Sequence, residues 1–181
     1  MVEMSIYGVS FDLVGKQPIV LLKTAEGNRY LPIWIGHPEA AAILMKLQGA
    51  TAPRPLTHDL LVNILNELDV EVLRVTVTEL RENTFHASIT VVQNGNELEI
   101  DSRSSDAIAV AVRAQVPIFA ADDVIEESAI EMEGDEVNEE EIVDEFKKFL
   151  DRVSAEDFAE AELEELFEEE DDEEEASEEE D

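Results

Sequence analysis

Residues 30–43, YLPIWIGHPEAAAI, pass from an apolar strand-like run into a helix-like run, and this pattern returns 67 positions later. The shift places Leu31 on Leu98 and Glu39 on Asp106 with no gap between them. The turns that precede these residues fall in register as well. Because self-similarity at a fixed spacing is typical of repeated structural units, the sequence predicts an internal duplication.

Each unit has the same order of elements, read from its hydrophobic period. Alternating or continuous apolar residues predict strands, and apolar residues three and four apart predict helices, with Thr57 as the N-cap of one of them and Trp34 in the core. The fold class is α/β (α+β), a mixed sheet of two duplicated three-stranded units with helices packed on it. The predicted strands are 7–13, 19–22, 30–35, 73–77, 85–91 and 98–100, and the helices are 38–48, 57–68 and one from Asp106.

The composition changes near residue 130 and predicts three segments. Residues 1–130 form one domain that folds alone, residues 131–167 form an acidic amphipathic helical extension, and residues 168–181 form a disordered polyacidic tail. Unpaired strand edges and the apolar helix 38–48 leave surface to cover and predict a homo-oligomer. The oligomer that we expect is a dimer. The helices of the extension need a surface to cover, which is either the domain, a second copy or a protein partner.

The net charge of -34 constrains the possible partners. Residues 1–130 hold 9 basic and 18 acidic residues, and the remaining 3 basic and 28 acidic residues follow. A polyanion repels nucleic acid, so chemistry on nucleic acid requires divalent cations or a local basic patch. The same acidity is also typical of a salt-adapted host. The chain has no cysteine and no membrane-length apolar run, and we expect a soluble, cytoplasmic protein.

Two polar clusters interrupt the apolar pattern where helices are expected to begin. They are residues 54–59, RPLTHD, and residues 101–106, DSRSSD. A structural interpretation makes Asp59 and Asp106 helix caps and pairs the arginines with nearby acids. A functional interpretation makes the acids ligands of Mg²⁺ or Mn²⁺, because carboxylate oxygens suit hard cations. The metal-binding candidates are Asp59, Asp101, Asp106 and Glu39, and the phosphate-binding candidates are Arg54, Arg103 and Ser105.

Four ordered motifs resemble the bifunctional nuclease domain family over about residues 3–127. The motifs are QPIVLL at 17–22, YLPIWIG at 30–36, RPLTHDLL at 54–61 and DSRSSDAIA at 101–109, with PIF at 117–119 completing the set. Ser104 stands where the family usually has proline. The resemblance implies DNase and RNase activity in some members, but it supplies no accepted set of catalytic residues.

The leading hypothesis is a metal-assisted nuclease that cleaves DNA or RNA with little sequence preference. Asp59, Asp101 and Asp106 would hold the ion, His58 would be the acid or base, and Arg103 would clamp the phosphate. This hypothesis requires the two clusters to converge. The alternatives are a non-catalytic binding or assembly module, which the acidic balance favours, and a small-molecule binder that uses the same pocket.

Overall fold

The computed structural model describes residues 1–11 and 17–131. The chain divides into two units, 1–142 and 143–181, and all described residues belong to the first. The predictions made for residues 132–181 lie outside the described residues. The described elements are, in order, β1 Val2–Phe11, β2 Pro18–Thr24, β3 Arg29–Trp34, α1 His37–Leu47, α2 Thr57–Glu67, β4 Glu71–Arg81, β5 Thr84–Gln93, β6 Asn96–Arg103, α3 Ser104–Ala114, β7 Ile118–Ala120, α4 Asp122–Ser128 and β8 Ile130–Glu131.

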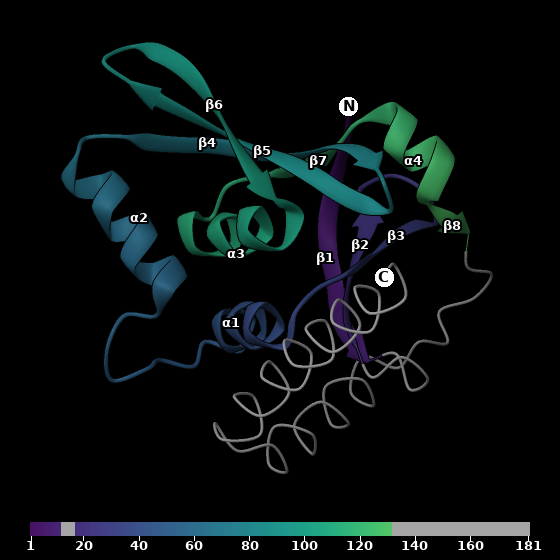
Figure 1. The fold of residues 1–181 in the computed structure, drawn as a ribbon, viewed down its shortest axis with the longest axis horizontal. Helices are drawn as coiled ribbons and strands as arrows, with labels where there is room; N and C mark the ends of the chain where they lie inside the picture. Colours follow the sequence, from purple (N-terminus) through teal and green to yellow (C-terminus); the bar gives the residue numbers. More distant parts are fainter. Residues whose placement is uncertain (12–16, 132–181) are drawn as a thin grey trace, which may run out of the picture. The chain divides into compact units, whose positions relative to one another are not determined.

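The strands of the described residues form one eight-stranded sheet in the order β6-β5-β4-β7-β1-β2-β3-β8 (Figure 1). Neighbouring strands are antiparallel except for β4 and β7, which are parallel. The short strand β7 therefore joins two three-stranded meanders into one mixed sheet. The predicted α/β class with a mixed sheet is confirmed.

The two meanders repeat in their bounds as well as in their order. A shift of 67 residues carries the first and last residues of α1 onto those of α3, and carries the start of β3 onto the start of β6. Since β7 is antiparallel to β1 and parallel to β4, the strands β1 and β4 run in opposite directions. The two units are thus related by an approximate twofold rotation that passes near β7.

Turn chemistry explains how the second meander closes. Glu82 and Asn83, between β4 and β5, both have positive φ angles of 49° and 62°. Asn94 and Gly95, between β5 and β6, have φ angles of 52° and 79°. Two consecutive residues with positive φ match the right-handed twist of paired strands, and Asn and Gly adopt this conformation at low cost. Both predicted turns are confirmed.

Three helices cover one side of the sheet. Helix α3 contacts both α1 and α2, and it also packs on β4, β5 and β6. Helices α1 and α3 bury small and branched residues in this layer, whereas α2 buries none. The N-terminal ends of α2 and α3 are consequently held by packing within one helical layer, which places the two polar clusters close together.

Two local predictions differ from the structure. Thr57 is the first residue of α2, and Leu56 is its N-cap. Trp34 is 53% exposed, because successive residues of a strand point to opposite faces and Ile33 and Ile35 take the buried one. Helix α4 has no counterpart among the predicted elements.

Candidate functional site

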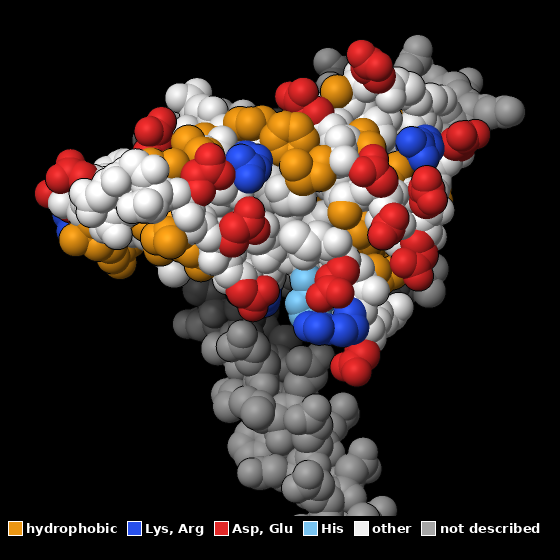
Figure 2. Space-filling model, turned by 90° about the horizontal axis from the view of Figure 1, so that it is seen from above, with side chains coloured by type: hydrophobic (Ala, Val, Ile, Leu, Met, Phe, Trp, Pro, Cys, Tyr) orange, Lys and Arg blue, Asp and Glu red, His pale blue; other side chains and the backbone are white. Residues whose placement is uncertain are grey.

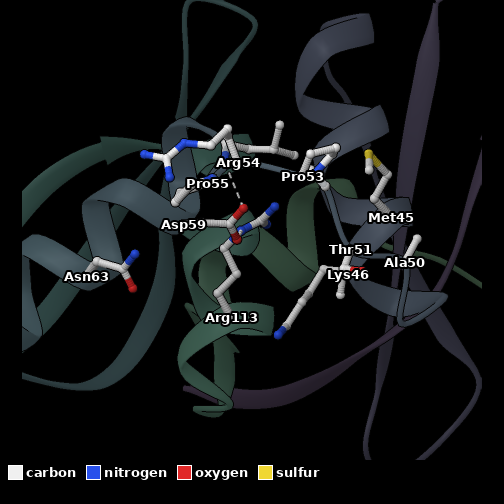
Figure 3. A pocket seen from close by; sticks show the side chains of 12 residues that line it. Met45, Lys46, Ala50, Thr51, Pro53, Arg54, Pro55, Asp59, Asn63 and Arg113 are labelled. Atoms are coloured by element: carbon white, nitrogen blue, oxygen red, sulfur yellow. Dashed lines mark hydrogen bonds and ion pairs between the residues drawn. The ribbon is translucent and has the colours of Figure 1, made fainter.

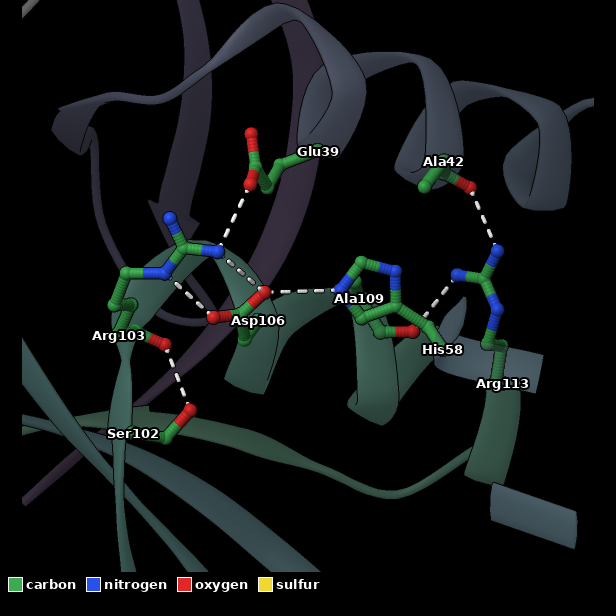
Figure 4. Close-up of polar contacts among 8 residues, drawn as sticks. All are labelled: Glu39, Ala42, His58, Ser102, Arg103, Asp106, Ala109 and Arg113. Atoms are coloured by element: carbon green, nitrogen blue, oxygen red, sulfur yellow. Dashed lines mark hydrogen bonds and ion pairs between the residues drawn. The ribbon is translucent and has the colours of Figure 1, made fainter. Parts of the chain in front are cut away.

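Arg103 stands at the junction of β6 and α3 and binds two acids from different repeats. Its Nε donates to Asp106 Oδ2 at 2.7 Å, and its Nη2 donates to Asp106 Oδ1 at 3.2 Å. The same Nη2 donates to Glu39 Oε1 of α1 at 2.9 Å. The two carboxylates hold the guanidinium from two sides (Figure 4), although the Arg103 side chain is 67% exposed.

His58 joins the same acid from a third helix. Its Nε2 lies 3.0 Å from Asp106 Oδ1, and the side chain is 12% exposed. With its hydrogen on Nε2, the imidazole donates to Asp106 and keeps Nδ1 as an acceptor. One carboxylate therefore orients both a histidine and an arginine. We call His58, Asp106, Arg103 and Glu39 the Arg103 network.

Asp106 and Arg103 keep their charges at neutral pH. Burial raises the pKa of Asp106, but the hydrogen bonds from Arg103 and His58 outweigh burial and leave the pKa below its ordinary value. The hydrogen bond with Asp106 raises the pKa of Arg103 against the opposing effect of burial. Asp106 thus remains an acceptor, and Arg103 remains a cation.

Asp59 faces a different arginine, although it follows His58 in the chain. Arg113 Nε donates to Asp59 Oδ1 at 2.6 Å, and Asp59 Oδ2 accepts the Leu56 backbone N–H at 2.9 Å. The Arg113 side chain is 4% exposed and also donates to the carbonyls of Ala109 at 2.9 Å and Ala42 at 3.1 Å. The capping interpretation holds for Asp59, which in addition ties α2 to α3.

The repeat explains why these groups meet. Glu39 and Asp106 are equivalent under the 67-residue shift, and the approximate twofold brings both to one guanidinium. Gly36 is the residue equivalent to Arg103, and a Cβ atom at Gly36 would collide with the Glu39 carboxylate. One repeat therefore supplies the arginine, and the other supplies the space for an acid.

Two cations near the site were missed in the sequence. Lys46 and Arg113 are also equivalent under the shift, and both line one cavity. A basic residue in the last turn of a helix is usually explained by its favourable interaction with the helix dipole. Arg113 was therefore not recognised as a site residue. The available signal was the repeat itself, which matches a basic residue to a basic residue.

Besides Asp59, three predicted site residues lie apart from the Arg103 network. Asp101 is exposed on β6 opposite Ser88, and within the described residues no ion pair or side-chain hydrogen bond joins it to the network. Ser105 is 7% exposed, and Arg54 is exposed in the loop before α2. The structure thus brings His58, Arg103 and Asp106 together with Glu39, and it places Asp59 beside Arg113.

The sequence also predicted a binding site for a divalent metal ion. In the part of the chain that the structure describes, no three His, Asp or Glu side chains gather closely enough to hold a metal ion. Glu39 and Asp106 are paired with Arg103, and Asp59 is paired with Arg113. A cation would have to displace an arginine from these acids, so the arrangement as it stands does not fit a metal. The metal ligands stay a prediction.

The paired aspartates predict a loss of stability in acid. Burial raises the pKa of Asp59, but its hydrogen bonds to Leu56 and Arg113 lower the pKa below the ordinary value. A depressed pKa stabilises the fold above the unfolded value of about 3.9, and this contribution is lost as the pH falls through the lower folded value. Asp59→Asn should therefore cost more stability at pH 7 than at pH 3, as measured by urea unfolding. An equal cost at both pH values would contradict the assignment.

None of the helices in the described residues is long and apolar enough to cross a membrane. This finding agrees with the lack of a membrane-length apolar run in the sequence.

Comparison with known proteins assigns the family. An uncharacterized protein of Mycobacterium tuberculosis is 40% identical over 163 residues, which cover 86% of this chain and 97% of that protein. Bifunctional nuclease 1 of Arabidopsis thaliana is 28% identical over 105 residues, or 56% of this chain and 32% of the plant protein. Bifunctional nuclease 1 of Oryza sativa subsp. japonica is 28% identical over 103 residues, or 55% and 31%. The bifunctional nuclease domain model matches residues 20–133, and the chain belongs to the bifunctional nuclease domain family.

Proposed function

We propose that the protein hydrolyses phosphodiester bonds of DNA or RNA with little sequence preference. The observation that carries this proposal is that the single carboxylate of Asp106 holds both a histidine and an exposed arginine. A histidine oriented by a carboxylate is suited to proton transfer, and a guanidinium is suited to a phosphate. The names of the plant relatives support the same reaction class, although those matches cover about a third of each plant protein.

Each member of the Arg103 network has a distinct proposed role. His58 takes a proton from the attacking water or returns one to the leaving oxygen, because its ring keeps one nitrogen that Asp106 does not occupy. Asp106 positions the imidazole and does not change its own charge. Arg103 binds the phosphate and stabilises the charge that develops on it. Glu39 holds the guanidinium in place from the opposite repeat.

We retain Mg²⁺ or Mn²⁺ as the proposed cofactor. A divalent ion would supply Lewis acidity and lower the pKa of a bound water. Asp59, Asp101, Asp106 and Glu39 could hold it only after a rearrangement that frees the paired acids from their arginines and brings the carboxylates together. These carboxylates are instead paired with arginines or set apart, so the roles above are assigned to side chains alone. Activity measured with each ion, and again with a chelator, tests the cofactor independently of the roles of the side chains.

The surface charge accounts for the expected lack of sequence preference. Figure 2 shows many acidic and few basic side chains on the face that it presents. Such a surface disfavours long contacts with a nucleic acid backbone, and specific readers depend on broad basic surfaces to set their register. Binding is then confined to the few cations of the site, and affinity should be low.

A matched pair of arginine variants tests the proposed reaction. Arg103→Met should lower cleavage of a labelled single-stranded oligonucleotide by about 10²–10³-fold, because it removes the charge that faces the phosphate. Arg81→Met is the control, since Arg81 is also exposed and paired with a glutamate, but it lies outside the network. Equal activity of the two purified variants would overturn the nuclease proposal.

A second candidate function is an assembly module, and the exposed face of α2 favours it. Helix α1, from which self-association was predicted, buries its apolar face inside the domain. Helix α2 buries no residue, and four large apolar side chains at or near helical spacing are exposed on it or at its end: Leu60, Leu61, Ile64 and Leu68. An apolar face of this kind commonly marks a protein interface. A second copy is the proposed occupant, because residues 60–66 carry no charge that would repel another acidic chain.

Self-association through α2 has a direct test. The protein should be dimeric by light scattering at micromolar concentration, and the double substitution Leu60→Glu with Ile64→Glu should make it monomeric because it places like charges at the interface. Ile130→Glu is the control, as this exposed apolar residue lies on β8 and not on α2. A monomeric wild-type protein would exclude the dimer.

A further inference from the structure

A cavity of about 280 Å³ lies between the end of α1, the loop of residues 48–56 and the start of α2. Figure 3 shows Asp59 and Arg113 near its centre, with Arg54 and Lys46 on opposite sides of this pair. The uncharged polar side chain of Asn63 also lines it. We call this cavity the Arg54 pocket.

The Arg54 pocket concentrates positive charge in an acidic domain. Three of the nine basic residues of the span 1–130 line it, namely Lys46, Arg54 and Arg113. Asp59 is the one acidic residue of the lining, and both of its oxygens are engaged, one by Arg113 and the other by the Leu56 N–H. The lining therefore carries a formal excess of two positive charges. This excess favours an anionic ligand.

Two of these cations are available to a ligand. Arg54 makes no ion pair and no side-chain hydrogen bond within the described residues, and it is exposed. Lys46 is exposed as well, and it influences Asp59 through its charge without an ion pair in the described part of the chain. The buried Arg113, held by Asp59 and two carbonyls, forms a fixed wall. The pocket thus combines the fixed guanidinium of Arg113 with two exposed donors, and guanidinium and ammonium groups both bind phosphate.

The pocket and the Arg103 network share one turn of helix. His58 belongs to the network, and the next residue, Asp59, belongs to the pocket. Arg103 and Arg113 stand at opposite ends of α3, ten residues or about 15 Å apart along its axis, so a strand of several nucleotides is needed to reach both places. The cavity is slightly smaller than the roughly 300–1,000 Å³ usual for whole ligands, which suits one phosphate with part of its sugar.

We propose that the Arg54 pocket binds a phosphate group, and that in nucleic acid cleavage it holds another phosphate of the strand whose scissile phosphate Arg103 binds. The second part rests on the proposed nuclease function. The pocket then sets how far the substrate must extend beyond the cleaved bond. A tetranucleotide with a terminal phosphate on the correct side is a better substrate than the same tetranucleotide without it.

The first experiment measures this preference in the full chain. Wild-type protein should have a KM about tenfold lower for a terminally phosphorylated tetranucleotide than for the unphosphorylated one, with similar kcat. Lys46→Ala combined with Arg54→Ala should remove the preference by raising KM for the phosphorylated substrate. Arg81→Ala, which lies outside the pocket, should keep it. A preference that persists in the double variant overturns the subsite.

The second experiment needs no activity. Inorganic phosphate is titrated into the full chain while the backbone amide signals of Asn63 and Thr51 are followed by NMR, because both residues line the pocket. Saturable shifts that vanish in the double variant support the pocket even if nuclease activity is absent. Shifts that persist in the double variant, or no shifts at millimolar phosphate, overturn it. Phosphate binding without any effect on KM in an active enzyme overturns the subsite alone.

Discussion

Replacing His58 with alanine should lower kcat for oligonucleotide cleavage by about 10²–10⁴-fold, the usual range for a positioned acid or base. The side chain is nearly buried, and its Nε2 lies 3.0 Å from Asp106 Oδ1, so the ring is held in one orientation. The loss should fall on kcat rather than KM, because Arg103 still binds the phosphate. Single-turnover cleavage measures the loss in the chemical step directly.

His86→Ala is the matched control for this prediction. His86 lies on β5 opposite Arg103 in the strand pairing, but its ring bonds to Arg81 and not to Asp106. This variant should retain wild-type kcat. Urea unfolding of both variants separates a catalytic loss from a loss of fold. Wild-type activity in a folded His58→Ala protein would remove His58 from the reaction.

The largest expected effect on stability comes from Arg113→Met. The buried guanidinium binds Asp59 and the carbonyls of Ala109 and Ala42, so it links α3 to both α2 and α1. Its removal leaves a carboxylate and two carbonyls without their donor and should lower the free energy of unfolding by about 3 kcal/mol. For a domain of this size we expect a fall in Tm of roughly 10 °C. Thermal and urea unfolding measure both quantities.

Two further variants show whether the ion pair is the cause. Arg103→Met removes an exposed arginine and should cost no more than about 1 kcal/mol. Adding Asp59→Asn to Arg113→Met should recover part of the loss, because the unpaired charge is then gone. If the Arg103 and Arg113 variants lost equal free energy of unfolding, burial of the Arg113–Asp59 pair would contribute nothing to stability.

The regular part of the fold could be predicted because it depends on local patterns. The alternation in β4 and β5, the Asn94–Gly95 turn and the apolar spacing in α1 are each visible within a few residues. The 67-residue shift then extended these local patterns to a repeated unit. Helix α4 and the strands β7 and β8 were not predicted, because each is too short to show a period.

The candidate site was only partly predictable, because its contacts depend on how helices pack. Residue types identified His58, Arg103 and Asp106, and the repeat indicated that Glu39 would join them. Nothing local distinguishes Asp59, which pairs with Arg113 across 54 positions, from an acid that caps its own helix. Asp101 was predicted to join the site because it belongs to the same motif as Asp106. It lies instead, exposed, on the edge strand β6 of the sheet.

One repeat has Gly36 where the other has Arg103, and this difference affects the direction in which a nucleic acid strand can bind. A twofold site with arginine at both equivalent positions would accept a nucleic acid strand equally well in either orientation. Gly36 leaves a single guanidinium, on one side of the axis, and Glu39 fills the space opposite. A strand bound by Arg103 and by the Arg54 pocket would then have one productive polarity. Cleavage would leave the new phosphate on the same end of every product, which end-labelling of either terminus can read out.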